Sequence, residues 1–217
     1  MYVKDHMKRN PFTADLSQSI SEALDIMSLS KIRRLPVVDK KGKLLGLLTD
    51  NEISSNTPNN SSSLSVFELN YLLNKLHVSD IMIKEPLTIG PDALLEEAAN
   101  KLIENDIGCL PVVDDENTLL GIITRTDIFS AFVDLLGYNQ VGSRYVINVS
   151  DDKPGIMEGI SRICKENNVS ISNIAVYHTE RGIEVIVMTS SKTDISNEFI
   201  NNGYNVTNYM KLHFNNE

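Results

Sequence analysis

Residues 35–53, LPVVDKKGKLLGLLTDNEI, and residues 110–128, LPVVDDENTLLGIITRTDI, are two versions of one phrase. Each begins with an apolar run that contains proline, turns through polar residues, and continues with a second apolar run that ends in threonine. A carboxylate follows three residues after that threonine, as Glu52 in the first copy and Asp127 in the second. Two short apolar runs on either side of a polar turn predict a β-hairpin, so we expect the same hairpin twice.

The similarity between the two copies extends well beyond the hairpin. A shift of 75 positions aligns residues 3–53 with residues 78–128 without a gap. Two copies with so long a period indicate a duplicated domain, because a solenoid has shorter and more numerous repeats. We therefore expect two repeats of equal architecture that pack about a pseudo-two-fold axis.

Each copy is predicted to have the order β-α-β-β-α. Between the first strand and the hairpin, apolar residues recur at the spacing of an amphipathic helix. They are Ile20, Ala23, Leu24 and Met27 in the first copy, and Leu95, Ala98, Ala99 and Leu102 in the second. Ser17 or Ser19 is the predicted N-cap of the first of these helices, and Asp92 that of the second. A further helix is expected to begin after the threonine that closes each hairpin.

The segment between the copies divides into a loop and a helix. Residues 54–63 are polar, which is typical of a loop, whereas residues 64–76 carry leucines at helical spacing. This second part predicts a helix that packs and leads into the second copy. We therefore place the first repeat at residues 1–60, and the second repeat with its preceding helix at residues 61–138.

Residues 143–217 are predicted to form a separate domain after a linker at residues 139–143. Strand-like runs and amphipathic helical runs follow one another there in the order β-α-β-β-α-β, which is typical of a ferredoxin-like sandwich. The predicted fold class of the whole chain is therefore α+β. It consists of two repeats of α/β type that form a pseudo-two-fold pair, followed by this sandwich.

Composition disfavours several functional classes. A formal net charge of −9 disfavours binding to nucleic acid, and no apolar run approaches the roughly 18–20 residues of a membrane span. The first residues lack the apolar region of a secretory signal, and the two cysteines, Cys109 and Cys164, lie in apolar patterns that suggest neither a disulfide framework nor a metal site. The scattered histidines form no catalytic motif. We expect a cytoplasmic protein that is not an enzyme.

The two hairpin phrases in register resemble the CBS-domain family in its tandem form, the Bateman module, over residues 1–135. The resemblance implies that an adenosine nucleotide of the AMP, ADP or ATP type binds in clefts of the pair as a regulatory ligand, with no catalytic cofactor. A carboxylate in the first turn of a helix suits a ribose diol, and a threonine hydroxyl with free amides suits a phosphate.

The resemblance implies two nucleotide sites of unequal strength. The stronger one is expected at Thr124 and Asp127, with Arg33 and Arg34 near the phosphates and a wall formed by Thr88, Ile89, Gly108, Cys109, Leu110 and Pro111. The weaker one is expected at Thr13, Ala14, Ile32, Leu35, Pro36, Thr49 and Glu52. It is ranked second because Glu52 stands where the family has aspartate. The alternative is structural: Asp127 stabilises a helix dipole and the arginines are solvated.

The run DDKPGIMEGISRICKENNVSISNI in the third segment resembles the ACT-domain family, which implies a homodimer formed edge to edge. In many relatives such a domain also holds an amino acid. The matching positions here are Asp151, Asp152, Lys153, Pro154, Gly155, Ile156, Asn173 and Ile174. The alternative is a Pro-Gly turn that enters a helix in a domain that only dimerises.

The order of two CBS repeats and one ACT domain resembles the acetoin-utilisation family, a name that implies no catalysis. We expect a sensor that transmits nucleotide binding through the dimer or to a regulated protein that the sequence does not identify. The alternatives are an oligomerisation or partner-binding module without a ligand, and a sensor of S-adenosylmethionine or of an amino acid.

Overall fold

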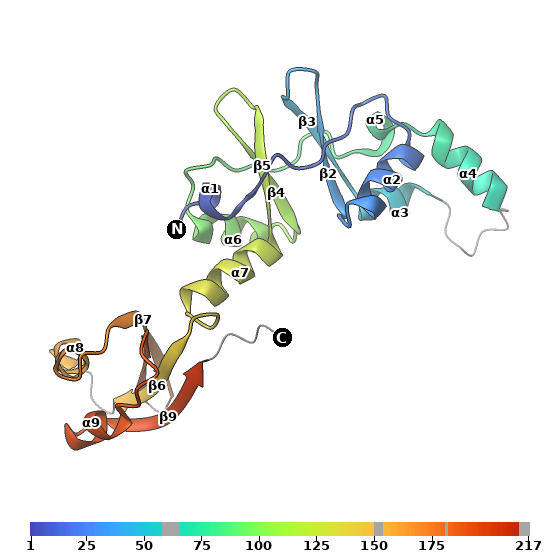
Figure 1. The fold of residues 1–217 in the computed structure, drawn as a ribbon. Helices are drawn as coiled ribbons and strands as arrows, with labels where there is room; N and C mark the ends of the chain where they lie inside the picture. Colours follow the sequence, from blue (N-terminus) through green and yellow to red (C-terminus); the bar gives the residue numbers. More distant parts are fainter. Residues whose placement is uncertain (58–65, 150–153, 181, 213–217) are drawn as a thin grey trace. The chain divides into compact units, whose positions relative to one another are not determined.

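The computed structural model describes residues 1–57, 66–149, 154–180 and 182–212 (Figure 1). Two compact units make up the chain, Met1–Ile128 and Phe129–Glu217. Within the described ranges, no helix has both the length and the apolar character that a membrane crossing requires.

The first unit contains one set of elements twice, which confirms the predicted duplication (Figure 1). The first repeat comprises α1 (Val3–His6), β1 (Lys8–Arg9), α2 (Ile20–Leu29), β2 (Arg34–Val38), β3 (Leu44–Thr49) and α3 (Asp50–Asn56). After α4 (Val66–Lys75), the second repeat comprises α5 (Val78–Ile81), α6 (Leu95–Glu104), β4 (Cys109–Val113), β5 (Leu119–Thr124) and α7 (Arg125–Leu135), which continues into the second unit. Equivalent elements begin 75 positions apart, as the sequence predicts.

The hairpins and the amphipathic helices form where they are predicted. β2 pairs with β3 and β4 with β5, both antiparallel and with a register shift at the equivalent residues Val37 and Val112. Ser19 is the N-cap of α2: its Oγ accepts from the Glu22 amide at 3.2 Å, and the Glu22 carboxylate accepts from the Ser19 amide at 2.9 Å. This reciprocal pair satisfies two amides that a helix start otherwise leaves free.

Two local predictions are wrong. Asp92 does not cap α6, because its carboxylate pairs with Lys4 at 2.6 Å, and the amide of Leu94 donates instead to Glu97 at 3.3 Å. The loop predicted from residue 54 begins later, because α3 continues to Asn56, whose side chain donates to the carbonyl of Glu52 at 2.8 Å. The rest of that predicted loop, residues 58–63, lies outside the described residues.

The strand expected at the start of each repeat is reduced to a single bridging residue. Ala14 bridges to Val37 and Ile89 to Val112, both in parallel. In the first repeat the chain turns at once, since the Asp15 carboxylate accepts from the Ser17 amide at 2.9 Å. In the second repeat Pro91 follows closely, and proline supplies no amide for a sheet.

The start of each repeat pairs with the hairpin of the other repeat. Lys8 lies opposite Ile122 of β5, and the equivalent Ile83 lies opposite Leu47 of β3. Lys43 also bridges to Thr118, which is its own equivalent. These reciprocal pairs relate the repeats by a pseudo-two-fold axis, as predicted, and they place residues of both repeats around each hairpin end.

After the end of α7, the described residues of the second unit form a four-stranded antiparallel sheet with helices α8 and α9, in the predicted β-α-β-β-α-β order. Its elements are β6 (Gly142–Val149), α8 (Ile156–Glu166), β7 (Ile171–Thr179), β8 (Gly182–Thr189), α9 (Ser196–Asn201) and β9 (Asn205–Leu212), and the strand order is β7-β8-β6-β9 (Figure 1). Tyr145 and Phe199 are fully buried at its centre, with ring centroids 5.3 Å apart in an edge arrangement.

Candidate functional site

The threonine and the acid that end each hairpin contact one another. In the second repeat the hydroxyl and the amide of Thr124 donate to Asp127 Oδ2, at 2.6 Å and 2.9 Å. In the first repeat the hydroxyl of Thr49 donates to the Glu52 carboxylate. Each acid thus lies in the first turn of a helix, as the sequence predicts. The structure adds that the threonine that ends the strand donates to this acid.

A cavity of about 390 Å³ lies beside Thr124 and combines residues of both repeats. We call it the basic cavity, because the second repeat supplies Ile122, Thr124 and Thr126 and the first repeat supplies four cationic residues and one apolar residue. These five are Lys8, Lys31, Ile32, Arg33 and Arg34. Lys8 reaches the cavity because β1 pairs with β5.

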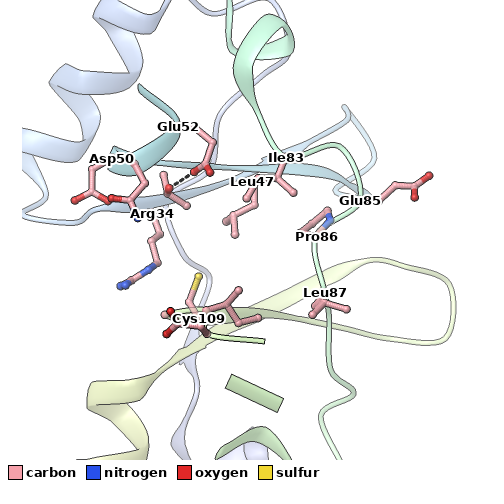
Figure 2. Close-up of a pocket in the computed structure, with 14 residues that line it drawn as sticks. Arg34, Leu47, Asp50, Glu52, Ile83, Glu85, Pro86, Leu87 and Cys109 are labelled. Atoms are coloured by element: carbon pink, nitrogen blue, oxygen red, sulfur yellow. Dashed lines mark hydrogen bonds between the residues drawn. The ribbon is translucent and has the colours of Figure 1, made fainter. Parts of the chain in front are cut away.

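A second cavity, of about 360 Å³, lies beside Thr49 and Glu52 (Figure 2). We call it the acidic cavity, because its lining includes four carboxylates, those of Asp50, Glu52, Glu85 and Asp106. The second repeat supplies Ile83, Pro86, Leu87, Gly108 and Cys109 to this lining. A shift of 75 positions relates its lining to that of the basic cavity, with Thr49 equivalent to Thr124 and Cys109 to Arg34.

The structure groups the predicted site residues across the repeats. Thr124 shares the basic cavity with Ile32, which the sequence grouped with the weaker site, and with Arg33 and Arg34. Thr49 and Glu52 share the acidic cavity with residues that the sequence grouped with Thr124, namely Gly108 and Cys109. The reason is the exchange of the starting segments, which turns each hairpin end toward the other repeat.

Several other predicted wall residues lie in the core or within the sheets. Leu35 and Leu110 are fully buried, and Ala14 and Ile89 are nearly so. Pro36 and Pro111 are paired in register with Leu47 and Ile122, Thr13 is half-buried, and the carbonyl of Thr88 accepts from the Lys101 ammonium at 2.9 Å.

The sequence analysis missed lining residues of two kinds. Lys8, Glu85 and Leu87 lie on the exchanged starting segments, whereas Asp50 and Thr126 follow the hairpins at the starts of α3 and α7. For Asp50 and Thr126 a signal existed, because both lie between the threonine and the acid of the repeated phrase.

Arg34 lines both cavities. In Figure 2 its side chain extends from the first hairpin toward the second, and the sulfur of Cys109 points into the acidic cavity. Among the carboxylates of that cavity, Asp106 already has a cationic partner, since its side chain lies 2.8 Å from the Arg125 guanidinium. Apart from the shared Arg34, the charged residues that line one cavity are cationic and those that line the other are carboxylates, although one duplication produced both cavities.

The thiol of Cys109 is free and buried, which disfavours its reactive thiolate form. Burial is the main cause that raises its pKa to about 11, while the nearby Arg34 guanidinium acts in the opposite direction. A thiol with this pKa is protonated near pH 7, and only the thiolate is reactive. Cys109 contributes a side chain with little nucleophilic character to the lining of the acidic cavity.

The predicted amino-acid site of the second unit is only partly described. Asp151, Asp152 and Lys153 lie outside the described residues, while Gly155 precedes α8 with φ of 97°, next to Pro154 and Ile156. Asn173 and Ile174 line a cavity of about 150 Å³ with Leu135, Leu136, Ala175, Ile186 and Met188. In the part of the chain that the structure describes, no group of three or more His, Cys, Asp or Glu side chains is placed to hold a metal ion.

Comparison with known proteins gives a family match for the duplicated unit. The model of the family described as "CBS domain" matches residues 3–56 and 78–134. A CBS domain-containing protein of Dictyostelium discoideum is 33% identical in an alignment of 140 residues that covers 62% of this chain and 92% of that protein.

Three examples illustrate the solved structures that resemble this unit. CBSX2 of Arabidopsis thaliana, in complex with AMP, is 29% identical with a TM-score of 0.54, over 62% of this chain and 97% of that one. An acetoin utilization protein (AcuB) from Vibrio cholerae is 31% identical with a TM-score of 0.53, over 63% and 93%. The CBS domain pair of protein MJ0100, in complex with 5′-methylthioadenosine and S-adenosyl-L-methionine, is 32% identical with a TM-score of 0.50, over 61% and 99%.

Proposed function

The chain belongs to the CBS-domain family, and on that basis we propose that it is a regulatory sensor that binds an adenosine nucleotide in its basic cavity. The observation that carries the proposal is the cluster of Lys8, Lys31, Arg33 and Arg34 around Thr124. Phosphate groups bind where cationic side chains, a hydroxyl and the start of a helix meet. The CBSX2 complex supports adenosine as the nucleoside, since AMP is bound to a related pair.

We assign Asp127 to the ribose because Thr124, which lines the basic cavity, donates to its carboxylate; Asp127 itself is not among the residues that line the cavity. Thr124 donates to its Oδ2 atom, which leaves Oδ1 to accept from a ribose hydroxyl. The hydrogen bonds from Thr124 also fix the carboxylate before a ligand arrives, so less conformational entropy is lost on binding. Arg33 and Arg34 then face the 5′ phosphate side, where they neutralise charge.

Isothermal titration calorimetry of the full chain with AMP, ADP, ATP and S-adenosylmethionine tests this proposal. We expect AMP, ADP or ATP to bind, and Arg33→Gln to weaken that binding by about tenfold or more, the usual value of a charge-assisted hydrogen bond. Lys40→Gln is the matched control, because it removes the same charge from an exposed residue of the β2–β3 turn. Absence of binding by every nucleotide at millimolar concentration, or equal effects of the two variants, contradicts the proposal.

We propose that the second unit is an ACT-type domain that forms a homodimer. Its sheet ends at strand β7, where Ile174 and Val176 are 44% and 47% exposed. A strand at a sheet edge with exposed apolar side chains is a template for pairing with another chain. A nucleotide regulates such a dimer or its partner protein only when it binds two states of the pair unequally.

Sedimentation of the full chain tests the dimer. We expect a dimer for the native chain and a monomer for the double variant Ile174→Lys and Val176→Lys, since charges at a sheet edge oppose pairing. Replacing the exposed Ile103 on α6 of the first unit by Lys is the control. A native monomer, or a variant that remains dimeric, contradicts this part of the proposal.

A further inference from the structure

The duplication has produced two cavities whose equivalent residues differ in charge. Lys31 of the basic cavity is equivalent to Asp106 of the acidic cavity, Arg33 to Gly108, and Arg34 to Cys109. Asp50 in the acidic cavity is equivalent to Arg125. The threonine at the strand end lines both cavities, so equivalent parts of the two repeats build them while the charged residues around them differ in sign.

The interior of the acidic cavity combines an apolar wall with a fixed acid. Leu47 is 5% exposed and lies with Ile83, Pro86 and Leu87 on one side, while Glu52 faces the cavity and accepts from Thr49 on the other (Figure 2). The carboxylate of Glu85 lies at the rim and points outward. A flat apolar group fits against the wall, and a cationic group fits beside the carboxylates.

Arg34 is the cationic residue in the lining of the acidic cavity, and the basic cavity shares it. A phosphate in the basic cavity attracts its guanidinium by charge-assisted hydrogen bonds. When the Arg34 guanidinium binds that phosphate, its positive charge no longer offsets the carboxylates of the acidic cavity. Anion binding in one cavity therefore favours cation binding in the other.

We propose that the acidic cavity selects a nucleoside-like ligand whose 5′ group is cationic and rejects one whose 5′ group is a phosphate. The nucleoside part of this inference rests on the proposed function, whereas the charge preference rests on the two linings. The two cavities are then occupied together by ligands of opposite charge.

Three adenosine derivatives that differ in their 5′ group test the preference: AMP, uncharged adenosine, and 5′-amino-5′-deoxyadenosine, whose amine is protonated at neutral pH. Calorimetry of the full chain with saturating AMP is expected to show one additional site per chain for the amine. Adenosine is expected to bind this site about tenfold more weakly, which is the value of roughly one favourable charge contact. The amine is expected to bind several-fold more tightly with AMP than without it.

Two matched variants assign the sites. Glu52→Gln is expected to weaken binding of the amine about tenfold and to leave the AMP affinity unchanged. Asp127→Asn is expected to weaken AMP and to leave the amine unchanged. Circular dichroism and thermal melting of each variant separate a binding effect from loss of folding.

Competition between AMP and the amine for one site overturns the proposal, as does an amine affinity that Glu52→Gln does not lower in a folded protein. If AMP binds and the amine does not, the charge preference fails and the proposed function stands. If no derivative binds at millimolar concentration, the proposed function fails and this inference with it.

Discussion

The guanidinium of Arg34, which begins β2, lies against Gly108, which precedes β4 of the other repeat. A Cβ atom on residue 108 would lie 2.9 Å from Arg34 Cζ, inside the closest distance that such atoms normally keep. The glycine therefore leaves the space that the arginine occupies. Because Arg34 lines both cavities, this contact joins the two candidate sites through one side chain.

Arg34→Gln is predicted to change the affinities of the two cavities in opposite directions. AMP binding should weaken about tenfold, because a phosphate loses a charge-assisted contact. Binding of 5′-amino-5′-deoxyadenosine should strengthen several-fold, because a repelling cation is removed. Calorimetry measures both, with Lys40→Gln as the control. A change of both affinities in the same direction would show that Arg34 does not act electrostatically on the two cavities.

Asp127→Ala is predicted to weaken AMP binding more than Glu52→Ala does. Asp127 accepts from both the amide and the hydroxyl of Thr124, which is in the basic cavity, whereas Glu52 lies in the acidic one. We expect a loss of about tenfold or more for Asp127→Ala and less than threefold for Glu52→Ala. Calorimetry with AMP decides, and equal losses refute this ranking of the cavities.

Gly121→Ala is predicted to destabilise the first unit by about 2 kcal/mol, because an added Cβ would lie 2.8 Å from the carbonyl oxygen of Lys8. The equivalent change Gly46→Ala places a Cβ 2.7 Å from the carbonyl of Ile83 and should cost a similar amount. Urea unfolding measures both. Gly90→Ala is the control, since no atom lies within 4 Å of its added Cβ. If Gly121→Ala and Gly46→Ala were as stable as Gly90→Ala, the backbone of the exchanged starting segments would move to accommodate the added Cβ atoms at little energetic cost.

The duplication and the hairpins could be predicted from the sequence because their signals are local. The LPVVD phrase, the polar turn and the closing threonine recur in order, and capping at Ser19 follows from a serine three residues before a glutamate. The exchange of the starting segments could not be predicted in this way. It depends on a long-range pairing of Lys8 with Ile122 that leaves no periodic pattern in either segment.

The cavities group the candidate site residues differently from the sequence analysis, for the same physical reason. Thr124 contacts Asp127, and Thr49 contacts Glu52. The residues opposite them come from the other repeat, so Gly108 lies with Glu52 instead of with Asp127. Leu110 was expected at a wall and is fully buried, since alternate residues of a short strand face the core.

Asp39 and Asp114 are predicted to make the stability of the first unit sensitive to acid. These equivalent residues accept from two backbone amides each: Asp39 from Lys41 and Lys43 at 2.8 and 2.9 Å, and Asp114 from Glu116 and Thr118 at 3.0 and 2.8 Å. The bond from the Lys43 amide is the largest cause that lowers the pKa of Asp39, and that from Thr118 the largest for Asp114.

Folding lowers the pKa of both carboxyl groups below the unfolded pKa of about 3.8, so their ionised forms stabilise the folded state. This stabilisation is fully present above the unfolded pKa and is lost as the pH falls through the pKa of the folded state. The double variant Asp39→Asn and Asp114→Asn should therefore lose less stability than the native chain between about pH 5 and pH 3. Urea midpoints at the two pH values measure this, with the exposed Asp25→Asn as the control. Parallel losses in the native chain and the double variant would show that these turns do not contribute to acid unfolding.

Tyr145→Phe is predicted to destabilise the second unit although the ring stays in place. The Tyr145 hydroxyl donates to the Thr193 carbonyl at 3.0 Å and accepts from the Ile195 amide at 3.2 Å, and Ile195 is 3% exposed. Removing the hydroxyl leaves a buried amide and a carbonyl without that partner, which costs about 1–3 kcal/mol. The edge contact with Phe199 remains, so the loss reports the hydrogen bonds and not the packing. Thermal melting of the native chain and of Tyr145→Phe measures the change. The control is Tyr177→Phe, which alters a 39% exposed tyrosine on β7. Equal melting temperatures of the two variants would mean that water or a shifted loop replaces both hydrogen bonds of Tyr145.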